Sequence, residues 1–286
     1  MKNNSDHIAT GFSCFDEVSG GLPSGKLCWI WGALPFVEEN LWFGLSLALE
    51  SASKYGTKIA IICFQTDPVI LKDCVAFVHP GLMQRLQIAD ADSLAADAGQ
   101  SDVFLVDARK VDDARLRDLM RNLSEGFHPV IVVMESIAAT NKTTGSFDHE
   151  LFSHLEEHAA ANKSGIIVIP FGSTYALQQF VGQNPEVEVF RKELYCHRSA
   201  GKHSGLNIFV VPEGEMRSPV AGYERLGTVR LDVDKTDGKG IQFAFMRYLR
   251  KETRQFEIIG VDPWGSFQLK NIVKFECGKF EVVWKD

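Results

Sequence analysis

The sequence predicts an α/β protein: a mostly parallel sheet flanked by helices, with antiparallel hairpins added on the C-terminal side. Two observations support this fold class. Over about the first 175 residues, short apolar runs alternate with stretches of helical period, which is the pattern of crossover units around a parallel sheet. Beyond about residue 205, runs of alternating apolar and polar residues are joined by glycine-containing turns, as in antiparallel hairpins. We expect a single domain, 1–286, with a parallel core over 1–175 and a hairpin extension over 205–286.

Five runs in the first part are apolar throughout, as expected of strands that are buried on both faces. They are residues 27–31, 59–64, 102–107, 128–135 and 165–170. The stretches of helical period between them predict helices at about 39–54, 112–126 and 148–163. The alternating runs of the C-terminal part are 206–211, 227–233, 240–249, 254–261 and 272–284.

Composition limits the classes of partner and the compartment. The 286 residues are 45% apolar and carry a net charge of −7, and no run of Lys or Arg is long enough to follow a phosphate backbone. We therefore expect no direct nucleic-acid partner.

No segment reaches the roughly 18 consecutive apolar residues of a membrane span, and the first residues lack the pattern of a signal peptide. Six cysteines, none in a Cys-x-x-Cys pair, fit reduced core residues. We expect a cytoplasmic protein that reaches a membrane only through a partner.

Residues 8–32, IATGFSCFDEVSGGLPSGKLCWIWG, carry the strongest functional signal. The Thr-Gly, the Phe-Asp-Glu, the Gly-Gly-Leu-Pro turn and the strand that ends in Gly32 resemble the segment before the phosphate loop of RecA-like ATPases of the KaiC, RadA and DnaB type. In that superfamily the loop reads G-x-x-x-x-G-K-[ST], whose backbone N–H groups wrap the phosphates while the lysine neutralises them. Here residues 32–39 read GALPFVEE.

Each departure from the phosphate-loop pattern disfavours nucleotide. Val37 replaces the second glycine, and a β-branched residue resists positive φ, while Pro35 removes an N–H. Glu38 and Glu39 stand at the lysine and hydroxyl positions, which turns an attraction of roughly 4 kcal/mol at about 4 Å into a repulsion. We therefore expect the chain to bind no ATP, no cofactor and no metal at this loop. We expect the carboxylates of Glu38 and Glu39 to lie at a helix N-terminus, where the helix dipole favours negative charge. An ordinary strand-to-helix loop over 33–40 is compatible with the same residues.

The same resemblance assigns further positions of a RecA-like site. Asp67 in FQTDP follows the second strand, where these ATPases often have a Glu that activates water. Glu135 in VVMES stands at the Walker B position, where an aspartate would bind magnesium. With Gly32, Glu38 and Glu39 these residues form a vestigial nucleotide site that holds no catalytic residue. Candidates for a basic finger donated to a neighbouring subunit lie in MRYLRKETR and are Arg247, Arg250, Lys251 and Arg254.

The order of the motifs gives a closer resemblance. The degenerate loop, then IAIICFQTDPVIL, PVIVVMES and GIIVIPFGS resemble the N-terminal domain of the BcsE family of bacterial cellulose-synthesis accessory proteins, over about residues 8–275. The resemblance implies a catalytically silent RecA-like scaffold that helps to regulate cellulose synthase assembly. In that family, C-terminal modules bind cyclic diguanylate through an R-x-G-D motif, which this chain lacks. Dinucleotide sensing is therefore not carried over, and the segment 175–225 is longer than the family pattern suggests.

HLEEH, residues 154–158, matches the H-x-x-E-H form of inverted zinc peptidases, with two histidines one helical turn apart. If Leu151, Phe152 and Leu155 face inward, His154 and His158 fall at the border of the buried face. We expect this segment to be the surface of a crossover helix and not a zinc site.

These observations favour a pseudo-ATPase that acts as a scaffold or regulator through other proteins, cellulose synthase accessory subunits or a second copy of itself. The expected partner surface combines an apolar, acidic loop with a basic hairpin edge. Its residues are Leu34, Phe36, Val37, Arg247, Arg250, Lys251 and Arg254. The alternatives are a nucleotide-binding ATPase of the KaiC or RadA kind and a recombination-mediator subunit. Glu38 and Glu39 argue against the first, and the weak basic character argues against direct DNA binding.

Overall fold

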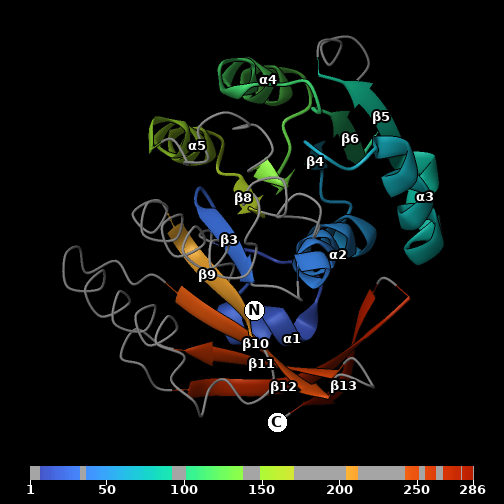
Figure 1. Ribbon diagram of the computed structural model, residues 1–286, viewed down its shortest axis with the longest axis vertical. Helices are drawn as coiled ribbons and strands as arrows, with labels where there is room; N and C mark the ends of the chain where they lie inside the picture. The colour runs from blue at the N-terminus through green and yellow to red at the C-terminus, as the bar shows by residue number, and fades with distance from the viewer. Residues whose placement is uncertain are drawn as a thin grey trace, which may run out of the picture.

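The computed structural model of the chain describes residues 7–32, 37–91, 101–137, 149–170, 204–211, 242–250, 255–261, 267–277 and 279–285. Within these residues one large sheet runs through the molecule, with helices on both of its faces (Figure 1). The strands of its parallel part are β3 (Leu27–Gly32), β4 (Ile59–Cys63), β5 (Leu86–Asp90), β6 (Val103–Asp107), β7 (Ile131–Glu135), β8 (Gly165–Val168), β9 (Ser204–Val211) and β10 (Gln242–Arg250). The strands that follow are β11 (Gln255–Val261), β12 (Phe267–Glu276) and β13 (Lys279–Lys285).

The strand order of the large sheet is β13-β12-β11-β10-β9-β3-β8-β7-β4-β6-β5. Every neighbouring pair from β10 to β5 is parallel. Every pair from β10 to β13 is antiparallel. A separate small sheet pairs β1 (His7–Ile8) with β2 (Leu22–Pro23). β3 therefore lies in the interior of the large sheet, and its carboxyl end lies on the same edge as those of β4, β6 and β7.

Helices cover both faces of the parallel part, which makes three layers (Figure 1). The helices are α1 (Ser13–Ser19), α2 (Val37–Tyr55), α3 (Pro68–Val78), α4 (Asp113–Gly126), α5 (His149–Asn162) and the short 3₁₀ helix η1 (Pro80–Arg85). Neighbouring residues of one strand face different layers: Ile61 packs in the core that contains Leu45 of α2, whereas Ile62 packs in the core that contains Leu119 of α4. Both faces are thus buried, which explains why these strands are apolar throughout.

The α/β fold with a parallel sheet and flanking helices is confirmed, and β3, β4, β6, β7 and β8 occur where the apolar runs predict them. The boundaries differ by a few residues. β7 begins at Ile131 and not at 128, because His128 adopts a positive φ of 53° that a strand does not allow. α2 begins at Val37, two residues before the expected start.

The direction of β9 differs from the prediction. Residues 206–211 were expected among the antiparallel hairpins, whereas β9 pairs in parallel with both β3 and β10. Alternation of apolar and polar residues indicates one buried face and carries no information on strand direction. More than thirty residues connect β8 to β9, which is enough to return the chain to the edge where the parallel strands begin, as parallel pairing requires. The antiparallel part is β10 to β13, and the expected strand at 227–233 lies outside the described residues.

Neither α3 nor β5 was predicted. α3 carries the usual start signals, since Asp67 caps it through a hydrogen bond from the Val69 backbone N–H to Oδ1 (2.9 Å) and Pro68 follows at the first helical position. β5 is a five-residue edge strand that pairs only with β6 among the described strands. Its Leu86 and Ile88 are only half-buried, so its sequence lacks the apolar run of a central strand.

The last hairpin packs against the first long helix. Phe280 of β13 meets Phe43 of α2 edge to face, with ring centroids 5.4 Å apart, and Lys279 forms an ion pair with Glu50 (3.0 Å). Cys28 and Cys63 are buried free thiols in β3 and β4, as expected, whereas Cys277 is exposed, so the expectation of a core position is wrong for Cys277. In the part of the chain that the structure describes, no helix has the length and apolar character needed to cross a bilayer.

Candidate functional site

The predicted site residues lie along the carboxyl edge of the parallel strands. Gly32 ends β3, Asp67 follows β4, and Glu135 ends β7. β8 separates β3 from β7, while β4 is the direct neighbour of β7 and pairs Cys63 with Glu135. Asp67 and Glu135 therefore follow adjacent strands, whereas Gly32 at the end of β3 lies two strands away from Glu135.

The structure places Glu38 and Glu39 in the first turn of α2, as the sequence predicts. Val37 is the first residue of that helix and not part of the preceding loop, so the prediction of a loop position for Val37 is wrong. A helical position spares Val37 the positive φ of a phosphate loop, which a β-branched residue rarely adopts. Leu34 and Phe36 lie outside the described residues.

Glu135 has a fully buried side chain whose two oxygens accept four hydrogen bonds. The backbone N–H groups of Gln65 and Thr66 donate to Oε2 (3.1 and 3.2 Å), and the Thr66 hydroxyl donates to Oε1 (3.2 Å). The hydroxyl of Ser136 also donates to Oε1. A carboxylate offers about four lone-pair directions, so these donors use all of them. The side chain fastens the turn after β4 to the end of β7.

Asp67 is also occupied by groups of the chain. Its Oδ1 caps α3, and its Oδ2 forms an ion pair with the Arg109 guanidinium (2.9 Å). Arg109 holds Asp107, the last residue of β6, in a two-pronged contact through Nε (2.9 Å) and Nη2 (2.6 Å). The hydrogen bond from Arg109 lowers the pKa of Asp107, and the two aspartates in turn raise the pKa of Arg109. Sequence analysis missed Arg109 and Asp107, although an Asp at a strand end followed two residues later by Arg is a visible signal.

Cys63, the last residue of β4, lies beside these carboxylates. Burial raises the pKa of its thiol well above the usual value, and Glu135 and Asp107 raise it further. The thiolate is the nucleophilic form of cysteine, so this residue is unsuited to nucleophilic catalysis at neutral pH.

The Thr-Gly and Phe-Asp-Glu segment before β3 forms a structural turn. Asp16 accepts hydrogen bonds from the backbone N–H (3.0 Å) and hydroxyl (2.7 Å) of Thr10 and from the backbone N–H of Gly11 (3.1 Å). Burial raises the pKa of Asp16, against the effect of these hydrogen bonds. Gly11 has a φ of +77°, and a Cβ there would lie 3.0 Å from the backbone oxygen of Glu50. The Thr-Gly and Asp of this motif thus fix the turn against α2.

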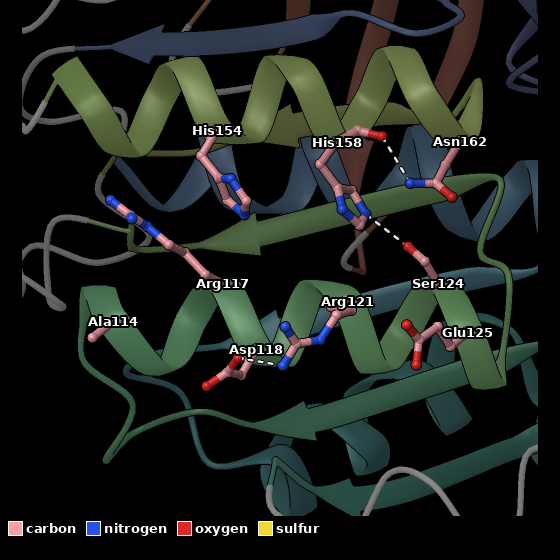
Figure 2. A pocket seen from close by; sticks show the side chains of 9 residues that line it. All are labelled: Ala114, Arg117, Asp118, Arg121, Ser124, Glu125, His154, His158 and Asn162. Atoms are coloured by element: carbon pink, nitrogen blue, oxygen red, sulfur yellow. Dashed lines mark hydrogen bonds and ion pairs between the residues drawn. The ribbon is translucent and has the colours of Figure 1, made fainter.

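A groove between α4 and α5 contains the HLEEH segment (Figure 2). Its lining residues are Ala114, Arg117, Asp118, Arg121, Ser124, Glu125, His154, His158 and Asn162. Both histidines are half-buried and point towards α4, at the border of the buried face as predicted. His158 Nε2 lies 2.8 Å from the Ser124 hydroxyl, and burial followed by the charge of His154 lowers the pKa of His158.

The charges around the groove are largely paired. Arg117 contacts Glu150 (2.8 Å) across the two helices, and Arg121 contacts Asp118 on its own helix (2.5 Å). Among the described residues no three His, Cys, Asp or Glu side chains gather closely enough to hold a metal ion. The contacts of the Arg117 and Ser124 side chains with Glu150 and His158 join α4 to α5.

The predicted partner surface is only partly described. Arg247 and Arg250 lie on β10, with Arg250 its last residue, while Lys251 and Arg254 lie outside the described residues. The register runs from Gly32 to Val210 of β9 and on to Met246 of β10. Two strand spacings are about 10 Å. The carboxyl ends of β3 and β10 therefore lie on one edge of the sheet, two strands apart.

Searches against models of known protein families and against curated proteins find no match to this chain.

Proposed function

We propose that this chain is a catalytically silent scaffold or regulatory protein of the RecA-like superfamily. One observation carries the proposal: both oxygens of Glu135 are saturated by hydrogen bonds from the β4–α3 turn and Ser136, in a fully buried position. A metal-binding carboxylate at a strand end needs a lone pair directed at the ion or at its water. The lone pairs of Glu135 instead accept hydrogen bonds from the β4–α3 turn and from Ser136.

Two further features agree with a silent site. Asp67 stands at the position of the water-activating residue. One oxygen of its carboxylate caps α3 and the other forms an ion pair with Arg109, so both oxygens already have partners within the chain. Glu38 and Glu39 put negative charge in the first turn of α2, where a phosphate would otherwise meet the backbone N–H groups. To bind Mg-ATP here, the carboxylates of Glu38 and Glu39 would have to turn away from the helix start or lose their charge.

Isothermal titration of the full chain with Mg-ATP tests the silent site. We expect no heat beyond dilution, because like charges oppose the phosphates. A dissociation constant below about 1 mM, equivalent to roughly −4 kcal/mol, would favour the alternative of a working KaiC-like or RadA-like ATPase. The matched variant Glu38→Lys with Glu39→Ser restores the usual charge pattern and reports whether these two residues account for the absence of binding.

We further propose, from the resemblance to the BcsE family, that the chain acts in bacterial cellulose or exopolysaccharide synthesis and secretion. Its partners would be accessory subunits of the synthase, and it would reach the membrane only through them. β3, which leads to Glu38 and Glu39, and β10, which ends with Arg250, finish on the same edge of the sheet. Opposite charges at such positions favour a contact with a partner of complementary charge.

Deletion of the encoding gene, followed by measurement of secreted cellulose with a cellulose-binding dye, tests this role. We expect lower polymer output, restored by the wild-type chain and not by a folded Phe36→Ala, Arg250→Glu double variant. Normal output in the deletion strain would contradict the cellulose role. Full restoration by a double variant with an unchanged circular dichroism spectrum would contradict the proposed surface.

A further inference from the structure

Glu50 of α2 is a buried carboxylate that contacts the last hairpin. Only 7% of the residue is exposed. Its Oε1 lies 3.0 Å from the ammonium group of Lys279, and its Oε2 lies 3.6 Å from that of Lys54. Lys279 begins β13, at the end of the β12–β13 hairpin that packs against α2 (Figure 1). The carboxylate of Glu50 therefore joins the end of the hairpin to the helix.

His79, at the junction of α3 and η1, lies close enough to this ion pair that both charges act on its ring. The residue is 6% exposed, and its Nε2 is buried without a hydrogen-bond partner among the described residues. Burial lowers the pKa of the imidazole, the charge of Glu50 raises it and the charge of Lys279 lowers it, with burial the largest effect. The imidazole is therefore uncharged at pH 7.

Among the described residues, Glu50 is the carboxylate that a protonated His79 can use. Other charged residues on the neighbouring elements are paired with one another or reach solvent. They are Lys274, Glu276 and Glu281 in the hairpin, Lys72 and Asp73 on α3, and Arg85 with Asp102 at η1. A buried imidazolium needs a counter-ion or water. It gains one only if Lys279 leaves Glu50 or if the end of the hairpin moves aside.

The hairpin is the part of this cluster that can move. Leu45 and Leu49 of α2 are buried in the core, whereas β13 is the last strand of the sheet and pairs with β12 alone among the described strands. Lys279 already has a side chain that is 38% exposed. Phe280, packed on Phe43, opposes the movement, since its ring is buried in the closed hairpin. A proton on His79 therefore shifts the opening equilibrium and leaves most molecules closed.

We propose that Glu50, Lys279 and His79 form an acid-sensitive latch on the C-terminal hairpin. At neutral pH His79 is uncharged and Lys279 pairs with Glu50, so the hairpin stays closed on α2. Below about pH 6.5 a solvated imidazole takes up a proton. The open hairpin then binds a proton that the closed form binds more weakly, and this linkage favours opening. The latch uses none of the residues of the nucleotide site, so it operates whether or not the chain binds nucleotide.

Hydrogen exchange of the full chain, measured by mass spectrometry between pH 7.5 and pH 5.5, tests this latch. Each exchange rate divided by the intrinsic rate at that pH gives an opening constant. We expect the opening constant of β13 to rise by up to about tenfold over this range, since opening takes up one proton. At each pH it should exceed those of β6 and β7 by at least about tenfold, because the hairpin opens without the core. A rise below about twofold, or equal constants in the three strands, would overturn the proposal.

Replacing His79 by Gln identifies the residue that takes up the proton. Gln does not titrate, so the rise for β13 should disappear in His79→Gln. His158→Gln is the matched control, since His158 is another half-buried histidine with a lowered pKa but lies between α4 and α5. The control should keep the wild-type rise in β13. An unchanged rise in a folded His79→Gln variant would overturn the role of His79.

Lys279→Gln tests the shared carboxylate without any change at His79. When the ammonium group is gone, Glu50 can pair with a protonated His79 in the closed hairpin. The opening constant of β13 should therefore be higher than in the wild type at pH 7.5 and should depend less on pH. Lys274→Gln, at a lysine whose partner Glu276 lies in its own strand, should keep the wild-type values. Wild-type values in Lys279→Gln as well would overturn the latch.

Discussion

Replacing Glu135 by Ala should destabilise the fold by about 2–4 kcal/mol. Truncation removes the acceptor for the backbone N–H groups of Gln65 and Thr66, and each buried donor left unsatisfied costs about 1–3 kcal/mol. Water that enters the half-buried turn recovers part of this loss, which sets the value below the upper sum. The hydroxyl of Ser136 also loses its acceptor, but it can rotate to another one.

Glu135→Gln separates hydrogen bonding from size. The amide oxygen can accept from the two N–H groups while its NH₂ donates to the hydroxyls of Thr66 and Ser136, so we expect a loss below about 1.5 kcal/mol. Glu157→Ala, an exposed glutamate on α5, serves as the control and should stay within about 0.5 kcal/mol of wild type. Urea unfolding followed by circular dichroism gives the free energies. If Glu135→Ala unfolds at the same urea concentration as Glu157→Ala, the four hydrogen bonds do not fasten the turn and the argument for a structural Glu135 fails.

Three further outcomes are expected. Glu38→Lys with Glu39→Lys should lower the free energy of unfolding by roughly 1–3 kcal/mol in urea melts, because two positive charges then meet the helix dipole; an unchanged melt would show that both residues are merely solvated. Arg109→Ala should raise the pKa of Asp107 towards about 3.9 in a carboxyl NMR titration and cost at most about 1 kcal/mol at pH 7. This stability exists above the unfolded pKa and disappears as the pH falls through the folded one, so a loss that persists in strong acid would contradict the pairing. His158 has a lowered folded pKa, so the unfolded chain binds more protons and stability falls as the pH drops below about 6.5; His158→Gln should show a shallower fall between pH 7.5 and 5.5, and an identical slope would contradict this.

The apolar runs predict the central strands because burial on both faces leaves a local mark in the sequence. β5 leaves no such mark, since an edge strand with half-exposed residues such as Leu86 has no need of a continuous apolar run. The direction of β9 depends on the route of the chain between strands, which residues 206–211 do not contain. Local composition therefore predicts where strands occur far better than how they are connected.

The site shows the same division between local and long-range information. The positions of Asp67 and Glu135 at strand ends follow from the sequence alone. Their partners do not, because Glu135 meets Thr66 across 69 residues and Asp67 meets Arg109 across 42. Whether a strand-end carboxylate is free or saturated is decided by which strands are neighbours. That information appears only once β4 is known to lie between β6 and β7.

The packing of β13 on α2 has a consequence for the order of folding. Phe43 is fully buried, and Phe280 supplies one of the rings that bury it. Glu50 finds its partner Lys279 in the same hairpin. During synthesis these late residues leave the ribosome more than two hundred residues after α2, so the growing chain carries an uncovered aromatic cluster for most of its translation. The first helix of the parallel core reaches its final packing only after the last strand has emerged, which leaves a nascent chain that a chaperone would be expected to shield.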